Sequence, residues 1–369
     1  MGGALRVLLV VNARDSAGVA RASAAGTAPR KDYLELQRAL GADLLDLDAL
    51  EARRWTRLVR RLAGAAVAQA LLAWSWSTRY EAIFVDRESA GLLLAALLAR
   101  RRRRPRLVLI GHLISGRAKR LFCRLCRPQR GITTLVLHAS RQRELAARGL
   151  GLRAEQLALV PYGVDDRFWH PMPGPPGRRI CSAGLEYRDY PTLLDALAGL
   201  DLETTIAAAS HWSRHPAFGS EEALPPGVRV AAYDYSGLRD LYARSQFVVV
   251  PLLQGENQAG ITTILEAMAM GKAVIVSRAR GQTDTVYDPR QRGSAAVPPP
   301  WAETGPNGIY VPPGDPRALR RAILHLLDRP EEAEGLGANG RRLVEGVLGL
   351  DRFTARMAAL IAEGPSTGG

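Results

Sequence analysis

The chain has 369 residues, which is too long for one ordinary hydrophobic core and suits two domains. Hydrophobic residues make up 47% and charged residues 23%, a composition that excludes wholesale disorder. The net charge of +14 is uneven, because residues 1–170 hold 30 Lys and Arg against 14 Asp and Glu, and the remainder holds 20 against 22. Such a basic half predicts an anionic membrane surface, a phosphorylated acceptor or nucleic acid as partner, unless the chain is simply arginine-rich.

Three cysteines are too few for a disulfide scaffold, so a cytoplasmic location is expected. Cys123 and Cys126 have the spacing of metal ligands, but no second pair of ligands is apparent, so we interpret them as free thiols on a helix. The apolar run Leu5–Val11 is typical of a first strand and not of a signal peptide. Leu62–Trp76 is also apolar, but it is shorter than the roughly 20 residues that span a bilayer.

Short apolar runs alternate with helical patterns through the first half of the chain. Strands are expected at 5–11, 44–47, 82–85, 107–110 and 134–137, and helices at 31–40, 53–74 and 89–100. This alternation predicts a parallel sheet covered by helices on both faces.

The expected helix over 53–74 carries five arginines together with Trp55, and Trp74 and Trp76 lie at its end. That composition fits a helix lying in a membrane interface and fits equally a core helix packed on its own sheet. The run Arg100–Arg104 adds a polybasic segment that would favour an anionic bilayer.

A Pro/Gly cluster at 171–177 cannot continue a helix or a central strand and indicates a linker. The alternation then restarts, with strands expected at 179–183, 203–208, 228–232, 247–251, 273–277 and 309–311, and helices at 190–200, 237–244, 262–270 and 316–327. We therefore predict an α/β protein with one Rossmann-like domain over residues 1–172 and a second over 178–345. Ligands should bind at the loops 12–30, 111–116, 184–190 and 252–261, which follow strands.

The loop after the strand ending at Pro251 carries the strongest chemical signal. A helix opens at Gly260, which lets the backbone approach a ligand closely, and the N–H groups of Ile261 and Thr262 at its start suit a phosphate. Glu266 lies about one turn inside this helix, where a carboxylate can accept both hydroxyls of a ribose.

Residues 266–274, Glu-Ala-Met-Ala-Met-Gly-Lys-Ala-Val, resemble the second half of the hallmark motif of the retaining glycosyltransferases of family 4. These are the group 1 glycosyltransferases, which include glycogen synthases and mannosyltransferases. Further segments at 135–144, 159–171 and 307–315 resemble that family in the same order, whereas residues 1–105 match only in general layout.

The resemblance implies the GT-B fold, with two Rossmann-like domains facing each other across a cleft. Residues 1–172 would then bind the acceptor and 178–345 the nucleotide-sugar donor. A C-terminal helix in 346–369 would return to the first domain and end in a tail. The implied reaction moves a sugar from a nucleoside diphosphate to a hydroxyl acceptor with retention at the anomeric carbon. No cofactor or metal is expected beside the donor, which we expect to be UDP- or GDP-linked.

The family places two acids at the donor, and the resemblance assigns the ribose to Glu266. The other acid contacts the donor sugar in the family, but this sequence has Gln258 there, and an amide hydrogen-bonds a hydroxyl without carrying charge. Glu256 is the alternative if the loop bends differently.

The family also holds the diphosphate with an Arg and a Lys after a strand-end Gly. Gly184 and Arg188 occupy the places of that Gly and Lys, whereas Leu185 replaces the Arg. The alternative for Arg188 is a surface arginine paired with Asp189, and Glu186 could instead orient it.

His112 follows the strand 107–110, where the family has a His that reaches the donor sugar or the acceptor. Without the resemblance, a lone loop His is more often solvent-facing or a capping group. Asp46 and Asp48 have metal-binding spacing, but we interpret them as loop-forming residues.

The sequence therefore predicts a cytoplasmic glycosyltransferase, or one peripheral on the inner face of the membrane. The acceptor would be an envelope lipid or polysaccharide, or else a small natural product. Three alternatives stay open: a sugar-nucleotide epimerase, a non-catalytic nucleotide-sugar-binding descendant, and a nucleic-acid-binding protein.

Overall fold

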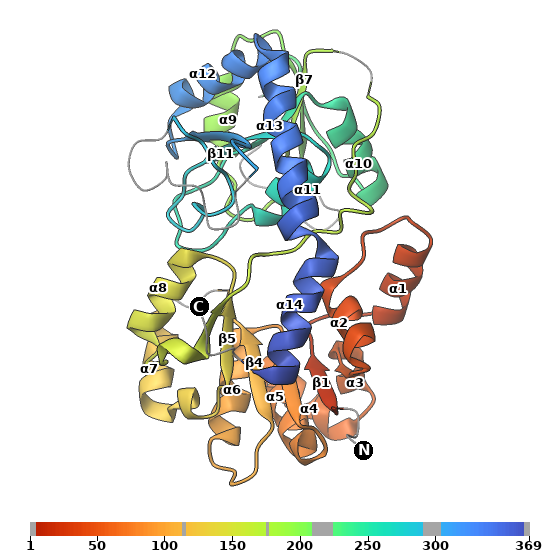
Figure 1. The fold of residues 1–369 in the computed structure, drawn as a ribbon, viewed down its shortest axis with the longest axis vertical. Coiled ribbons are helices and arrows are strands. Elements are labelled where there is room, and N and C mark those ends of the chain that lie inside the picture. Colours follow the sequence, from red (N-terminus) through yellow and green to blue (C-terminus); the bar gives the residue numbers. More distant parts are fainter. Residues whose placement is uncertain (1–4, 113–115, 175–176, 209–223, 291–303, 365–369) are drawn as a thin grey trace. The chain divides into compact units, whose positions relative to one another are not determined.

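The computed structural model describes residues 5–112, 116–174, 177–208, 224–290 and 304–364 (Figure 1). The chain forms two compact units. Unit 1 comprises Met1–Ala24, Arg30–Pro161 and Asp351–Gly369, and unit 2 comprises Ala25–Pro29 and Tyr162–Leu350. Each contains a six-stranded parallel sheet, which confirms the expected α/β architecture with two Rossmann-like sheets.

The sheet of unit 1 has the strand order β2-β1-β3-β4-β5-β6. Its strands are β1 Val7–Val10, β2 Asp43–Leu45, β3 Ala82–Val85, β4 Arg106–Ile110, β5 Thr134–Leu137 and β6 Leu157–Leu159. Every residue of β1, β3 and β5 is buried, because helices cover both faces of this sheet (Figure 1). The helices are α1 Ser16–Ala24, α2 Asp32–Leu40, α3 Leu47–Glu51, α4 Arg54–Ala63, α5 Ala65–Trp76, α6 Glu88–Leu98, α7 Arg117–Cys126 and α8 Ser140–Gly149.

The single helix expected at 53–74 is wrong, because the chain breaks into α4 and α5 at Gly64. This glycine has a φ of 88°, a backbone conformation that a helix cannot contain and that a side chain would disfavour. The two tryptophans at the end of the segment face the core of unit 1. Trp74 and Trp76 pack against the buried cluster of unit 1, and Arg101 and Arg53 stack over their rings at 4.4 and 4.8 Å. The core alternative therefore holds for α5, whereas α4 packs on the core through Thr56 and Val59 only and is otherwise largely exposed.

Unit 2 repeats the architecture with the strand order β12-β11-β10-β7-β8-β9. Its strands are β7 Arg179–Ala183, β8 Glu203–Ala207, β9 Val228–Val230, β10 Phe247–Val250, β11 Ala273–Ser277 and β12 Gly308–Val311. Its helices are α9 Tyr190–Leu197, α10 Tyr235–Arg244, α11 Ile261–Ala269, α12 Pro316–Leu327 and α13 Pro330–Leu343. As the sequence predicts, Asp315 caps α12, because its carboxylate accepts a hydrogen bond of 2.8 Å from Ala318 N.

The last helix, α14 Leu350–Glu363, begins at the end of unit 2 and continues in unit 1 from Asp351. Phe353, Met357 and Ile361 are buried at four-residue spacing, so one face of α14 is a core face. Asp351 also pairs with Arg30 at 2.6 Å within unit 1. No helix in the described residues is both long enough and apolar enough to cross a bilayer.

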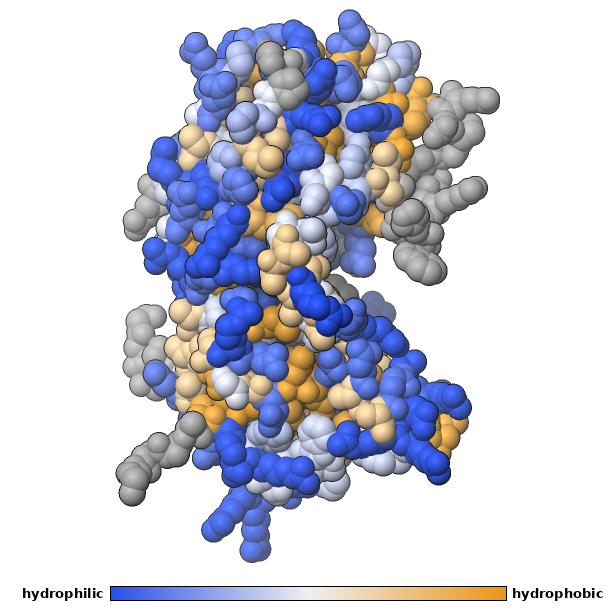
Figure 2. Space-filling view, turned by 90° about the vertical axis from the view of Figure 1, so that its right-hand side faces the viewer, coloured by the Kyte–Doolittle hydropathy of each residue, from blue (hydrophilic) through white to orange (hydrophobic). Residues whose placement is uncertain are grey.

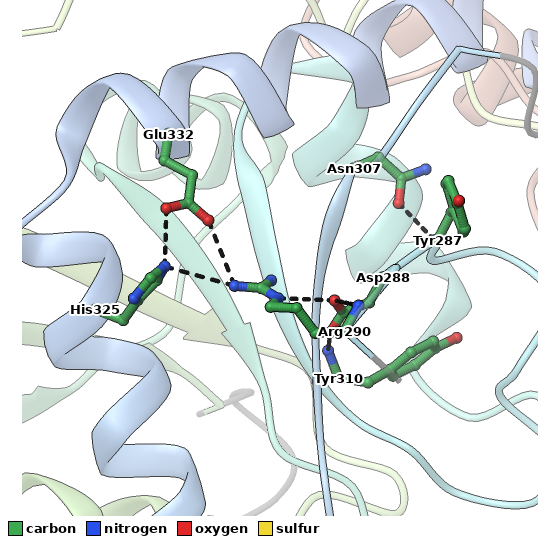
Figure 3. A network of polar contacts seen from close by, with 7 residues as sticks. All are labelled: Tyr287, Asp288, Arg290, Asn307, Tyr310, His325 and Glu332. Atoms are coloured by element: carbon green, nitrogen blue, oxygen red, sulfur yellow. Dashed lines mark hydrogen bonds and ion pairs between the residues drawn. The ribbon is translucent and has the colours of Figure 1, made fainter. Parts of the chain in front are cut away.

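A buried carboxylate organises the short segment 287–290, which follows β11 (Figure 3). Asp288 is 1% exposed, and its two oxygens accept hydrogen bonds from Tyr310 N at 2.9 Å, Arg290 N at 3.0 Å and Arg290 Nε at 2.8 Å. Arg290 also reaches Glu332 on α13 at 3.4 Å, and Glu332 bonds to His325 on α12 at 2.8 Å. The network therefore joins this segment to β12 and to two helices.

We expect Asp288→Ala to lower the free energy of unfolding of unit 2 by about 2–4 kcal/mol, because it leaves several N–H donors without an acceptor. Glu332→Gln, at the exposed end of the same network, should cost less than about 1 kcal/mol. Urea denaturation of both variants gives the comparison. Equal losses would contradict the central role of Asp288.

Candidate active site

A cavity of about 500 Å³ opens in unit 2 at the carboxyl ends of its strands. The loops that follow β7 and β10, the end of β8 and the first turn of α11 line it. Most of the residues singled out from the sequence meet here, namely Gly184, Arg188, Gln258, Gly260, Ile261, Thr262 and Glu266. These residues come from segments up to 82 positions apart, and the parallel sheet brings their loops to one edge.

The N-terminus of α11 forms one wall of the cavity. Gly260 precedes the helix with a φ of +76°, and a Cβ there would lie 2.9 Å from Val250 Cγ1 and 3.0 Å from Leu252 Cδ2. Both its conformation and its packing therefore require glycine. The first-turn N–H groups of Ile261 and Thr262 have no acceptor within the helix, so the site favours an anion such as a phosphate.

Arg188 is 7% exposed and is held by three hydrogen bonds. Its Nε donates to Ala183 O at 2.8 Å, Nη1 to Glu186 O at 2.9 Å and Nη2 to Thr263 Oγ1 at 2.9 Å. Burial lowers the pKa of Arg188 from its ordinary value, yet a guanidinium stays protonated. A positive charge is thus fixed beside the start of α11.

The alternatives for Arg188 do not hold in this geometry. Asp189 caps α9 through Thr192 N at 3.3 Å and Thr192 Oγ1 at 2.7 Å, and Arg188 is not at the surface. Glu186 contacts Arg188 through its backbone carbonyl and not through a carboxylate bond. Gly184 makes room for the guanidinium, because a Cβ there would lie 2.3 Å from Arg188 Nη2.

Glu266 lies at the floor of the cavity and is 7% exposed. Its Oε2 accepts a hydrogen bond of 3.0 Å from the hydroxyl of Tyr242, which is fully buried on α10. Burial, and then the negative charge of Glu266, raise the pKa of Tyr242 well above its ordinary value, so the phenol remains a donor. The motif pattern provides no signal for Tyr242, because it lies 24 residues before its partner.

The loop before α11 brings Gln258 to the cavity and not Glu256. Gln258 is 9% exposed, and its Nε2 donates to Thr285 Oγ1 at 3.4 Å. Its Oε1 is buried and has no hydrogen-bond partner within the described residues. Glu256 is absent from the cavity lining and pairs with Arg280 at 3.2 Å. An unpaired amide oxygen at a cavity wall can accept a hydrogen bond from a ligand hydroxyl.

His112 belongs to unit 1, where it follows β4. It is half-buried, and its Nε2 lies 3.1 Å from Asp86 O, so a neutral ring in which Nε2 donates that bond leaves Nδ1 as the acceptor. Its backbone N donates to Glu88 Oε2 at 3.2 Å, and Gln142 donates to its carbonyl at 3.2 Å. Three contacts thus hold His112 in place.

Asp86, which sequence reasoning missed, follows β3 beside His112. Its Oδ2 accepts a hydrogen bond of 2.7 Å from Asn12 N at the end of β1. Burial, aided by repulsion from Asp32 and Glu88, raises the pKa of Asp86 to about 6. A carboxylate with a raised pKa at a strand end is typical of a functional site, and the rule that ligands bind after strands would have found it.

The other two motifs have structural roles. Asp46 caps α3 through Ala49 N at 3.0 Å, and Asp48 accepts from Asp15 N at 2.7 Å, which confirms the loop interpretation. Cys123 and Cys126 are free and lie on α7. The described residues contain no group of three or more His, Cys, Asp or Glu arranged to hold a metal.

Comparison with known proteins supports the family resemblance. Residues 188–329 match the family model of the glycosyl transferases group 1. An MMP alpha-(1->4)-mannosyltransferase of Mycolicibacterium hassiacum is 28% identical over 216 residues, which are 56% of this chain and 48% of that protein. The chain thus matches about half the length of this curated relative.

Solved structures share the fold over nearly the whole chain. Sucrose-phosphate synthase from Thermosynechococcus elongatus superposes with a TM-score of 0.70 at 18% identity, covering 96% of this chain and 98% of that one. Anabaena HepE in complex with UDP-glucose gives 0.68 at 14% identity, covering 97% and 99%. The chain has the GT-B fold, and the match over residues 188–329 makes that part of unit 2 similar to the glycosyl transferases group 1.

The raised pKa of Asp86 makes a pH-dependent prediction. The folded state binds the proton of Asp86 more tightly than the unfolded state does, so protonation of Asp86 stabilises the fold. This contribution to the free energy of unfolding is complete below about pH 4 and is lost as the pH rises through about 6. Asp86→Asn keeps an acceptor for Asn12 N without the charge. As the pH rises from 4.5 to 7.5, we expect the free energy of unfolding of the wild type to fall by about 2 kcal/mol relative to that of this variant, as measured by urea denaturation.

The exposed carboxylate of Glu144, replaced in Glu144→Gln, is the matched control for the same pH series. A difference between Asp86→Asn and the wild type that stays constant with pH would contradict the buried, perturbed state of Asp86.

Proposed function

We propose that the protein is a retaining glycosyltransferase of family 4 that transfers a hexose from a nucleoside-diphosphate sugar to a hydroxyl acceptor. The observation that carries the proposal is the cavity of unit 2, where a helix N-terminus and the buried Arg188 lie beside the carboxylate of Glu266. These groups match the two parts that every such donor shares, a diphosphate and a ribose.

Departure of the nucleoside diphosphate is the step that this chemistry must assist. Negative charge develops on the leaving oxygens, and the N–H groups of Ile261 and Thr262 together with the guanidinium of Arg188 would stabilise it. These donors are held before the reaction begins, so little reorganisation opposes it. The solved complex of HepE with UDP-glucose and the name of the mannosyltransferase relative support a UDP- or GDP-linked hexose as donor.

Gln258 shapes the sugar end of the site. Its amide is neither charged nor nucleophilic, so this position forms no covalent glycosyl intermediate. The unpaired Oε1 would instead accept a hydrogen bond from a sugar hydroxyl and fix the anomeric carbon for attack.

The acceptor hydroxyl would be held by unit 1, where His112 and Asp86 lie together at the strand ends. The basic first half of the chain favours an acceptor at an anionic surface, so we propose a role in cell-envelope glycolipid or polysaccharide synthesis on the inner face of the membrane. A natural-product glycosyltransferase is the alternative with a small acceptor.

A second candidate is a non-catalytic nucleotide-sugar-binding descendant. It is favoured by Gln258 and Leu185, which stand where the resembled family has charged groups. It retains the same ribose and diphosphate contacts, so only turnover distinguishes it from the enzyme.

Donor binding is tested by thermal stabilisation with UDP, GDP, ADP, TDP and CMP. One nucleoside diphosphate at 100 times its Kd should stabilise the protein by roughly 2.7 kcal/mol. Glu266→Ala should abolish the shift because the ribose contact is lost, and Glu256→Ala should keep it because Glu256 does not line the cavity. Stabilisation by none of the nucleotides would refute the donor site.

Turnover is tested by hydrolysis and transfer assays with UDP- and GDP-hexoses, and the anomeric configuration of the product is read by NMR. Gln258→Ala should lower kcat/KM by about 10–100-fold while leaving nucleoside-diphosphate affinity unchanged, because it removes one hydrogen bond to the sugar only. Tight donor binding by a wild-type protein that releases no nucleotide would favour the non-catalytic descendant. An isomerised free nucleotide sugar would indicate an epimerase.

A further inference from the structure

Exposed apolar side chains gather on two helices of unit 1. Eight large hydrophobic residues are exposed in the described chain, and five of them lie on α4 and α7. On α4 these are Trp55, Leu58 and Leu62, with 43, 57 and 78% of their surface exposed, and on α7 they are Leu121 and Leu125, with 56 and 70%. In Figure 2, hydrophobic surface lies among hydrophilic residues on unit 1, in the lower half of the view.

The apolar residues of α4 form a stripe that faces away from the core. Residues 55, 58 and 62 follow helical spacing along one side. The flank of the helix beside this stripe faces inward. Thr56 is fully buried there and donates its hydroxyl to Leu50 O, and Val59, one turn after Trp55, packs on the core of unit 1. The side chains of Trp55, Leu58 and Leu62 are therefore exposed and add little to the core of the folded unit.

Both helices carry positive charge beside their exposed apolar residues, and most of it has no acidic partner among the described residues. Neither contains an acidic residue, and each carries four basic ones. Arg60 pairs with Glu51 and Lys119 with Glu88. The other six form no ion pair within the residues that the structure describes, and they are Arg54, Arg57, Arg61, Arg117, Arg120 and Arg124.

The chain topology places both helices on one face of the sheet of unit 1. The connection from β2 to β3 carries α4, and the connection from β4 to β5 carries α7. Both connections run in the same direction across the strand order β2-β1-β3-β4-β5, so right-handed crossovers put their helices on the same face. Contacts of α5 with α4 and with α6 agree with this layer.

We propose that α4 and α7 form a docking surface for an anionic lipid bilayer. In such a surface the leucines and Trp55 enter the boundary between headgroups and acyl chains, while the flanking arginines contact lipid phosphates. A second copy of the chain fits less well, because it would oppose one arginine-rich face with another. A nucleic acid would engage the arginines but leave the leucines in water.

The docking surface is linked to the proposed acceptor site through α7. Lys119 of α7 pairs with Glu88, and the other oxygen of Glu88 accepts a hydrogen bond from the backbone of His112. The inference locates the membrane contact suggested under the proposed function, but it does not depend on glycosyl transfer. Membrane docking can therefore fail while the donor site holds, and the reverse is also true.

The test is co-sedimentation of the full chain with vesicles of phosphatidylcholine alone and of phosphatidylcholine with 30% phosphatidylglycerol. The protein should bind the anionic vesicles, and binding should fall as salt rises. Arg57→Gln with Arg61→Gln should weaken binding by about 30-fold, since each charge near an anionic surface contributes about fivefold. Arg317→Gln with Arg321→Gln, two exposed arginines of α12 in unit 2, is the matched control and should bind as the wild type does.

A second pair of variants separates a bilayer from other polyanions. Leu58→Ser with Leu62→Ser keeps every charge and should weaken vesicle binding by at least about tenfold. Leu253→Ser, at an exposed leucine of unit 2, should not. The four substituted residues of α4, at positions 57, 58, 61 and 62, are all exposed. The circular dichroism spectrum and the nucleotide-induced thermal shift should therefore be unchanged in these variants.

Three outcomes overturn the proposal. The first is equal binding to neutral and anionic vesicles, or to neither. The second is loss of binding in the arginine variants with full retention in the leucine variants, which indicates a general polyanion site. The third is concentration-dependent self-association of the wild type that Leu58→Ser with Leu62→Ser abolishes, which indicates an interface between copies.

Discussion

The cavity of unit 2, the proposed donor site, depends on the buried guanidinium of Arg188, which ties the end of β7 to the first turn of α11. Two of its bonds go to backbone carbonyls of its own loop and one to Thr263. Gly184 must lack a side chain because the guanidinium occupies that space, and Gly260 must lack one because Val250 and Leu252 pack against it. The buried cation therefore accounts for Gly184 and for the positive charge beside the start of α11, whereas apolar packing accounts for Gly260.

Each unit buries a polar group unfavourably at the place where its chemistry is proposed. In unit 2 the oxygen of Gln258 is buried without a partner, and in unit 1 the carboxylate of Asp86 is buried enough to raise its pKa to about 6. Both arrangements are unfavourable in a protein that only needs to fold. The buried carboxylate of Asp288 differs from both, because its two oxygens accept hydrogen bonds from three N–H donors. Asp86, by contrast, accepts one such bond, from Asn12 N, and Gln258 Oε1 accepts none within the described residues.

Charge is likewise divided by role. Part of the excess positive charge of the first half lies on α4 and α7, beside their exposed leucines. Arg53 and Arg101, by contrast, stack on Trp76 and Trp74. Some arginines thus extend the core through cation–π contacts, and others remain available to an anionic surface.

The sequence by itself determined the alternating strands and helices and the two-sheet class, because periodicity is a local property. The resemblance of its loop motifs to a known family singled out the residues between Gly184 and Glu266 that we assign to the proposed donor site. Tertiary structure alone decided the rest. Gly64 split one expected helix into an exposed α4 and a buried α5, since burial depends on what packs against each face. The pairing of Tyr242 with Glu266, and of Asn12 with Asp86, joins residues 24 and 74 positions apart. No local pattern encodes such contacts, because the first forms only when α10 and α11 pack together and the second only when the parallel sheet brings the ends of β1 and β3 side by side.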